Sequence, residues 1–330
     1  MRRRDLLKLA ALSAGAAALD GAAAALPSAA STSIPVIDTH IHLFDTLRPG
    51  GVPWPLKTDT ALYKPALPPR YAKLSAPEGV VGAIAIECSP LPSDNQWLLN
   101  VVAAHPVMVG MVGDLVPGSP TYEKDLERLH ADPHFLGIRY GNLWQRNGAT
   151  DDLAADIDKP GFLDGLKSLA AAGLVLDSAN PDPRLIGGLL RVSQQVPDLR
   201  IVIDHLPNCT VPTEPAARAQ YQANLRALAQ NPNVFIKLSE IPVVQNGRLE
   251  TNPRFYEPKL DAIWDVFGED HILFGSDWPN SDHVAPYAQT FAIVRAYIGR
   301  KSAEAQQKFF WKNSTAAYRW QPRRPDQHLL

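Results

Sequence analysis

Short apolar runs alternate along this chain with longer segments in which apolar residues recur every three or four positions. The runs have the length of buried β-strands, and the longer segments have the periodicity of amphipathic helices. The predicted strands are 34–43, 80–87, 107–114, 135–140, 174–177, 201–205, 234–239 and 272–277. The predicted helices are 96–104, 122–130, 162–172, 184–195, 214–230 and 258–267, with a last helix near 303–318 that closes the bottom or side of the fold. Strands that alternate with helices pair in parallel, so the pattern predicts an α/β protein.

Eight such units within roughly 300 residues fit a single-domain (β/α)8 TIM barrel. A doubly wound sheet is less economical, because no glycine-rich phosphate-binding sequence follows the first strand. Most predicted strands end in polar residues, and in a barrel these ends meet on the catalytic face. The polar residues at or near strand ends are His40, His42, Glu87, Asp114, Arg139, Asp177, His205, Lys237 and Asp277.

Alternation along a strand predicts which side chains share a face. The residues expected to face the barrel interior are therefore Asp38, His40 and His42 of the first strand and Ala83, Ala85 and Glu87 of the second. Ile84 and Ile86 are expected to face the helices. Asp204 precedes His205 on the sixth strand, and we expect it to point away from His205, toward the helices.

The first thirty residues differ in composition from the rest of the chain. Arginines at positions 2–4 precede an alanine-rich run to Leu26, and small residues follow at Ser28 and Ala30. This order is typical of a signal peptide, and the paired arginines indicate twin-arginine export. We therefore expect a signal peptide over 1–30, a mature domain over 31–330 and a periplasmic or secreted protein without stable membrane insertion after cleavage. The alternative is an N-terminal anchor or amphipathic helix.

The formal net charge of the chain is -2. This charge gives the protein no overall positive potential, so a nucleic-acid partner is not expected. We expect a small-molecule substrate instead.

Three short motifs carry a family resemblance. They are His40-Ile41-His42, Ile203-Asp204-His205-Leu206-Pro207 and Phe274-Gly275-Ser276-Asp277-Trp278-Pro279. In this order and at these separations they resemble the amidohydrolase superfamily, in particular the amidohydrolase-related branch that contains sugar lactonases and 2-pyrone-4,6-dicarboxylate lactonase. The resemblance implies a (β/α)8 fold and hydrolysis of a lactone ester, with Asp277 as the base.

The residues themselves suit this chemistry. Lactone hydrolysis needs a water, a base that takes its proton, and donors or positive charge at the carbonyl oxygen. Asp277 ends an apolar strand, where partial desolvation raises the proton affinity of a carboxylate. His40, His42 and His205 either hold a divalent ion or donate hydrogen bonds to the carbonyl.

The need for a metal stays open at this point. Many metal-dependent members carry a lysine or glutamate on strand four and a histidine on strand five, whereas this chain has Arg139 and Asp177 there. A binuclear site is therefore not expected. The two remaining alternatives are a metal-free enzyme and a single divalent ion, zinc above all. The expected ligands of that ion are His40, His42 and Asp277, with Glu87 as a fourth.

Five further residues are candidates for substrate binding. Arg139 suits a carboxylate or hydroxyl, or forms a structural salt bridge with Asp177 or Glu87. Lys237 invites the same pair of interpretations, because a buried lysine needs a partner. Trp54 lies in a proline-rich loop expected to form a lid or pocket wall. The remaining two candidates, expected at the mouth of the site, are Trp144 and Asn180.

The main hypothesis is an exported hydrolase that opens a lactone ring of a sugar acid or dicarboxylate. One alternative is a metal-dependent non-oxidative decarboxylase of the same superfamily. Another is a non-catalytic periplasmic binding protein. The substrate and the oligomeric state stay open, because specificity depends on the loops and is not set by the fold.

Overall fold

Eight parallel strands form one sheet that closes into a barrel. The computed structural model describes residues 34–146 and 149–328, so the predicted signal peptide lies outside the described residues. The sheet order is β1-β2-β3-β4-β7-β8-β9-β12, and a parallel bridge from Ile41 to Trp278 closes it. The strands are β1 Val36–Ile41, β2 Val80–Ile86, β3 Met108–Gly113, β4 Phe135–Arg139, β7 Val175–Ser178, β8 Arg200–Ile203, β9 Val234–Leu238 and β12 Ile272–Phe274. The predicted α/β barrel is confirmed.

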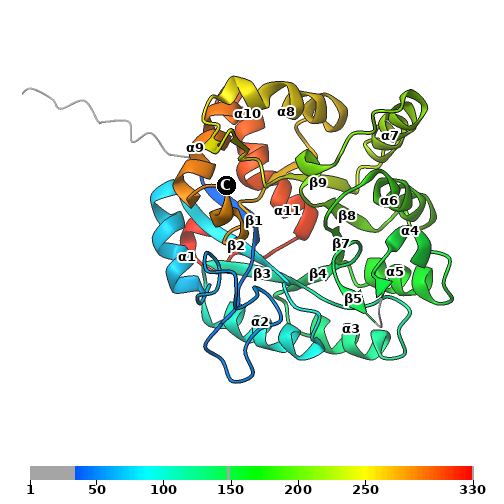
Figure 1. Cartoon of the computed structure of the whole chain (residues 1–330). Coiled ribbons are helices and arrows are strands. Elements are labelled where there is room, and N and C mark those ends of the chain that lie inside the picture. The colour runs from blue at the N-terminus through cyan, green and yellow to red at the C-terminus, as the bar shows by residue number, and fades with distance from the viewer. Residues whose placement is uncertain (1–33, 147–148, 329–330) are drawn as a thin grey trace, which may run out of the picture. The chain divides into compact units, whose positions relative to one another are not determined.

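Helices surround the strands on the outside of the barrel (Figure 1). They are α1 Pro68–Ser75, α2 Pro92–Ala104, α3 Tyr122–His130, α4 Leu153–Asp156, α5 Phe162–Ala171, α6 Pro183–Gln195, α7 Pro215–Leu228, α8 Pro253–Phe267, α9 Tyr287–Ile298, α10 Ala303–Gln307 and α11 Asn313–Tyr318. Five of them begin at a proline, which fits the first turn because an N–H there would have no helical partner. Helices α1 and α9 were not predicted. Helix α9 is apolar along most of its length, so it lacks the periodicity of an amphipathic helix.

Two hairpins extend the loops that follow β4 and β9. The first pairs β5 (Gln145–Arg146) with β6 (Ala149–Thr150), and the second pairs β10 (Val244–Gln245) with β11 (Arg248–Leu249). Because they follow barrel strands, both belong to the carboxyl end of the barrel.

Apolar side chains fill the lower part of the barrel interior. The inward residues of the strands are Ile37, Ile84, Ile86, Val109, Val112, Leu136, Val175, Val202, Phe235 and Leu273. Tyr318 and Trp320, from α11 and the segment after it, join this cluster. Arg200, the first residue of β8, donates to the carbonyl of Ala317 at 2.7 Å. The end of the predicted last helix therefore closes the amino end of the barrel, as expected, although its middle is a π-helical turn over Lys308–Lys312.

Several predicted side-chain directions in β1 and β2 are wrong. In β2, Ile84 and Ile86 face the interior, so the alanines between them face the helices. In β1, the pairing with β2 shifts register between Asp38 and Ile41. A bulge of this kind breaks the alternation of side chains. Asp38 therefore points outward and accepts hydrogen bonds from Tyr71 of α1 and Tyr287 of α9.

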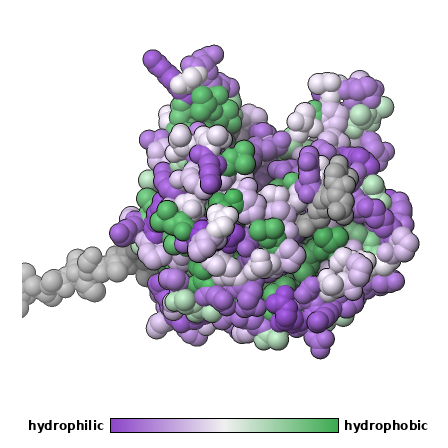
Figure 2. Space-filling model, turned by 60° about the horizontal axis from the view of Figure 1, so that its bottom comes forward, coloured by the Kyte–Doolittle hydropathy of each residue, from purple (hydrophilic) through white to green (hydrophobic). Residues whose placement is uncertain are grey.

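The surface in Figure 2 carries its hydrophobic residues in small groups scattered among polar ones. In the described part of the chain, no helix has the length and apolar character needed to cross a membrane.

Candidate functional site

A cavity of about 260 Å³ lies at the carboxyl ends of the barrel strands. A cavity of this kind suits a small molecule. The described residues that line it are His42, Trp54, Cys88, Arg139, Leu143, Trp144, Ala179, Asn180, His205, Glu240, Asp277 and Asn280. Seven of the predicted site residues are among them, and they come from loops and strands all around the barrel. His40 lies fully buried beneath His42 and Asp277.

An unusual backbone conformation marks four of the lining residues. Asn180, His205, Glu240 and Asp277 have φ values of 50°, 53°, 51° and 59°, and each follows the end of a barrel strand. The left-handed conformation costs a residue other than glycine about 1–3 kcal/mol, and it tends to gather at functional sites. Its repetition around one cavity indicates that these positions are held for function.

The left-handed turn at His205 explains how two neighbouring residues both reach the interior. Asp204 continues the alternation of β8 and points inward, which corrects the prediction that it faces the helices. Its Oδ1 lies 2.8 Å from Lys237 Nζ, and its Oδ2 lies 3.6 Å from His40 Nδ1. His205 is then turned back toward the cavity, where its ring lies 4.5 Å from that of His40.

Asp277 occupies the centre of the histidine cluster. Its Oδ1 lies 3.4 Å from His40 Nε2 and 3.2 Å from His42 Nε2, and among the described residues it has no hydrogen-bond partner. Its Oδ2 accepts a hydrogen bond of 2.7 Å from the Asn280 amide. Burial raises the pKa of Asp277 to about 7, against the opposing effect of the Asn280 hydrogen bond. A carboxylate with this proton affinity can accept a proton from water near neutral pH.

All three histidines are neutral at neutral pH. Burial lowers the pKa of His42 to about 4, with the charge of Arg139 acting in the same direction. Burial also lowers the pKa of His40 and His205 well below the usual range. His42 Nδ1 lies 3.0 Å from the Ile86 carbonyl, which only accepts, so the proton is on Nδ1 and Nε2 keeps its lone pair.

Lys237 lies below the cavity and is not among the residues that line it. Its ammonium group forms buried ion pairs of 2.8 Å with both Asp177 and Asp204. It also lies 3.3 Å from His40 Nδ1, and the Tyr318 hydroxyl donates to Asp177. Of its two predicted interpretations, the structure shows the pairing with protein groups. This ion-pair network fixes the position of His40 from beneath.

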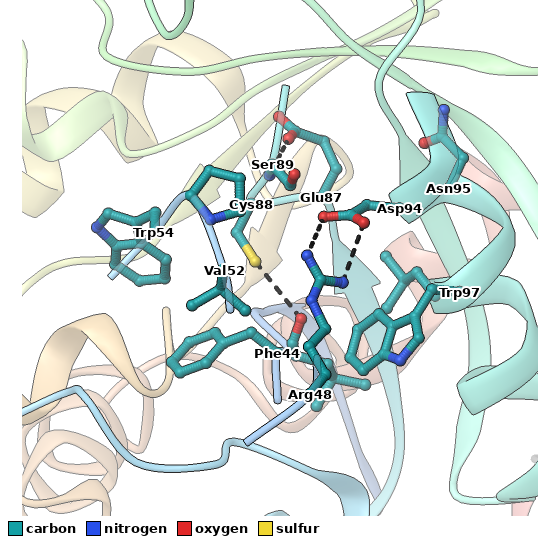
Figure 3. A pocket seen from close by; sticks show the side chains of 13 residues that line it. Phe44, Arg48, Val52, Trp54, Glu87, Cys88, Ser89, Asp94, Asn95 and Trp97 are labelled. Carbon is teal, nitrogen blue, oxygen red and sulfur yellow. Dashed lines mark hydrogen bonds and ion pairs between the residues drawn. The ribbon is translucent and has the colours of Figure 1, made fainter. Parts of the chain in front are cut away.

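Glu87 is not part of the group of side chains that could hold a metal ion. Its carboxylate accepts hydrogen bonds from Arg139 Nε at 2.8 Å, Trp144 Nε1 at 3.0 Å and the Ser89 N–H at 3.0 Å. It lines a smaller lateral pocket together with Trp54 and Cys88 (Figure 3). The predicted salt bridge between Arg139 and Glu87 is therefore present. Glu87 holds Arg139 and Trp144 in the cavity wall instead of offering its oxygens to a metal.

Trp54 forms part of the cavity wall, as expected for the proline-rich loop. Its ring lies 5.7 Å from the ring of His42 and 5.4 Å from that of Phe44, in edge-on contacts. Asn180, across the cavity, donates from its side-chain amide to the Asn142 carbonyl at 2.9 Å. Both residues are therefore held by the protein and lie where a ligand can meet them.

Glu240 is a cavity residue that the sequence analysis did not identify. Its Oε1 accepts from the Asn280 amide at 3.1 Å, and its Oε2 accepts from the Asn208 amide. Burial and the neighbouring Asp277 carboxylate raise the pKa of Glu240 to about 8. It stands two residues after the end of β9, as His205 does after β8, and this shared position is the signal that could have identified it.

The described residues include a group suited to one metal ion. His40, His205 and Asp277 can each present a ligand atom within 4.8 Å of the others. Two imidazoles and a carboxylate are ligands that zinc accepts, and the unpartnered Asp277 Oδ1 would gain a partner. The residues therefore fit a single divalent ion. His40 and Asp277 are in this group as predicted, whereas the predicted ligands His42 and Glu87 are outside it and His205 is in it.

A parallel eight-stranded barrel with histidines and an aspartate at its strand ends defines a class of hydrolytic barrel enzymes. The sequence model of the amidohydrolase family matches residues 37–320, a range that includes the whole cluster. The chain belongs to the amidohydrolase family and is a hydrolase of that superfamily.

Individual relatives agree with this assignment. L-Fucono-1,5-lactonase from Burkholderia ambifaria is 30% identical over 303 residues, which cover 88% of this chain and 98% of the relative. A solved amidohydrolase from Burkholderia multivorans with bound zinc has a TM-score of 0.73 at 22% identity, over 87% of this chain and 100% of that one. A probable 2-pyrone-4,6-dicarboxylic acid hydrolase from Acinetobacter baumannii, solved with citric acid, has a TM-score of 0.66 at 18% identity, over 86% and 99%. The two structures support the fold alone.

Proposed function

We propose that this protein hydrolyses a lactone ring, with a water molecule activated by Asp277. The observation that carries the proposal is the position of Asp277, whose unpartnered Oδ1 faces two neutral imidazoles at the base of a small cavity. In this mechanism Oδ1 accepts a proton from water as the water oxygen attacks the lactone carbonyl. Ring opening then breaks the ester bond, and the alkoxide that leaves takes up a proton to give a hydroxy acid.

The histidines act on the carbonyl oxygen. His40 Nδ1 lies 3.3 Å from Lys237 Nζ and 3.6 Å from Asp204 Oδ2. When Lys237 donates to Nδ1, the proton of His40 is on Nε2, from which it can stabilise an oxyanion. When Nδ1 instead donates to Asp204, Nε2 presents a lone pair. Both tautomers thus have a partner in the protein.

A divalent ion would be held by His40, His205 and Asp277, with His42 beside them. When bound, it would polarise the carbonyl and lower the pKa of water. The tautomer with Nδ1 toward Asp204 is the one that this binding requires, because a ligating nitrogen needs its lone pair. In the metal-free protein, the other tautomer makes His40 a hydrogen-bond donor.

The substrate in this proposal is a small lactone. Arg139 and Trp144 are fixed by Glu87 in one wall, and Trp54 lies in another. The L-fucono-1,5-lactonase relative supports a sugar lactone as the substrate class. We also propose that residues 1–30 direct the protein to the periplasm or outside the cell, on the basis of their arginine pair and alanine-rich run.

The proposal can be tested by following proton release with a pH indicator. A panel of sugar and dicarboxylate lactones is incubated with the wild-type protein, with Asp277→Asn and with Asp164→Asn. Asp164 is an exposed residue of α5, so the last variant controls for the chemical change alone. We expect turnover by the wild type and the control and its loss in Asp277→Asn. If no lactone of the panel releases protons and aromatic or muconate-type acids release carbon dioxide, the decarboxylase alternative would be supported instead.

A further inference from the structure

Glu240 is the half-buried carboxyl group of the cavity to which the proposed hydrolysis assigns no role. It follows β9 by two residues and has a φ of 51°, so its backbone repeats the conformation of His205 after β8 and Asn180 after β7. It lines the main cavity and also an adjoining chamber of about 280 Å³, which meets the first at Glu240, Asp277 and Asn280. The carboxyl group is thus presented to whatever molecule lies beside Asp277.

Two amides hold the Glu240 carboxyl group from the protein side. Asn280 donates to Oε1 and Asn208 donates to Oε2, so the orientation of the group is fixed before any ligand arrives. Beyond these two bonds and its side-chain contact with the Asp277 carboxyl group, the oxygens of Glu240 keep lone pairs that can accept further hydrogen bonds. The remaining sites suit the O–H groups of a polyol, which is the kind of donor that a rigid carboxyl group selects.

The charged residues around the cavity also favour a neutral polyhydroxylated ligand. Arg139 is the one lysine or arginine among the described lining residues. Its Nε donates to the Glu87 carboxylate and its Nη2 donates to the Glu87 backbone carbonyl, so its ion pair is already formed within the protein. Recognition of a carboxylate usually relies on an arginine or lysine that is free to form a charge-assisted pair. A dicarboxylate would instead meet two further carboxyl groups, those of Asp277 and Glu240.

We infer that Glu240 is a specificity-determining residue that binds substrate hydroxyl groups, and that the site consequently takes a neutral polyhydroxylated lactone in preference to a dicarboxylate lactone. This inference rests on the proposed lactone hydrolysis for its kinetic test, but the binding of hydroxyl groups can be measured without turnover.

The kinetic test compares two neutral lactones with the same six-membered ring. One is a six-carbon sugar 1,5-lactone, and the other is δ-valerolactone, which has no hydroxyl groups. We expect Glu240→Gln to lower the ratio of their kcat/KM values by about 2- to 10-fold, the effect of losing a hydrogen bond between neutral groups. Most of this change should be in KM for the sugar lactone. Glu127→Gln, on the exposed face of α3, makes the same chemical change away from the cavity and should leave the ratio as it is.

Three results would overturn the inference. The first is an unchanged ratio in Glu240→Gln. The second is a loss of activity that is equal for both lactones, because Glu240 would then act on the chemical step and not on the hydroxyl groups. The third is a wild-type enzyme that prefers a dicarboxylate lactone to the sugar lactone.

Calorimetric binding of a sugar 1,5-lactam separates this inference from the proposed function. The lactam carries the same hydroxyl groups on a ring that resists hydrolysis, and we expect its Kd to rise by about 2- to 10-fold in Glu240→Gln. If no lactone is hydrolysed but the lactam binds in this way, the proposed function fails and the role of Glu240 stands. If sugar lactones are hydrolysed while the lactam binds both proteins equally, the role of Glu240 fails alone. Thermal unfolding of each variant confirms that the binding data come from folded protein.

Discussion

Replacing Asp277 with asparagine should abolish activity and, at the same time, stabilise the metal-free protein. Asparagine cannot take a proton from water, and loss of a general base typically lowers the rate by about 10²- to 10⁴-fold. The stabilisation follows from the burial of Asp277, whose side chain is 1% exposed. A carboxylate that must be kept in this position destabilises the folded state, whereas a neutral amide of the same shape does not.

The size of the stabilisation depends on pH in a way that the pKa values define. Burial raises the pKa of Asp277 from 3.8 to about 7. Between these values the unfolded chain releases its proton while the folded protein keeps it, so ionisation favours unfolding as the pH rises from about 4 to about 7. At 1.36 kcal/mol per unit, Asp277→Asn should raise the free energy of unfolding by about 4 kcal/mol at pH 8 and about 2 kcal/mol at pH 5, with no difference near pH 3.

Chemical denaturation of both proteins at pH 5 and pH 8, after removal of metal with a chelator, measures this difference. Wild-type kcat/KM, followed in parallel, should rise about tenfold between pH 6 and pH 8, because the base must be ionised. An Asp277→Asn protein that is less stable than the wild type at pH 8 would refute the reasoning. So would an Asp277→Asn protein that retains wild-type turnover. Asp164→Asn, with its exposed side chain, should show neither effect.

Three other changes probe the groups around Asp277. Lys237→Met should lower the free energy of unfolding by about 3–5 kcal/mol, since it leaves two buried aspartates without their cation, and chemical denaturation measures this loss. Glu87→Gln removes the carboxylate that holds Arg139 and Trp144, so kcat/KM should fall by about tenfold, mainly through KM, in steady-state kinetics. His205→Ala should weaken zinc binding by at least about tenfold in titrations against a competing chelator, and unchanged affinity would exclude the three-residue metal site.

The sequence was sufficient to predict the barrel because eight apolar runs of strand length, most of them separated by helical segments, can be recognised along it. It also predicted that His40, His42, His205 and Asp277 lie together, since polar residues at strand ends stand out against apolar strands. Side-chain directions were harder to predict. The bulge after Asp38 depends on the pairing of β1 with β2, and no residue of β1 predicts this bulge from the sequence.

Positive φ angles are the second reason why some site residues could not be predicted from the sequence. Glycine and asparagine signal a left-handed conformation in a sequence, but His205 and Glu240 do not. His205 was identified through its motif, whereas Glu240 had no motif and was overlooked. The role of Lys237 depended on which carboxylates the fold places beside it, and those come from β7 and from the end of β8, far along the chain.

The buried network beneath the cavity has a consequence for the base above it. A protonated His40 would form an ion pair with Asp277, and an adjacent positive charge would lower the pKa of that carboxyl group and weaken it as a base. Burial keeps the pKa of His40 low, and the charge of Lys237 adds to this effect. Asp177 and Asp204 balance Lys237, so that its charge can be kept in the barrel interior. Lys237 thus favours the neutral form of His40, the residue next to Asp277, although Lys237 itself lies outside the cavity.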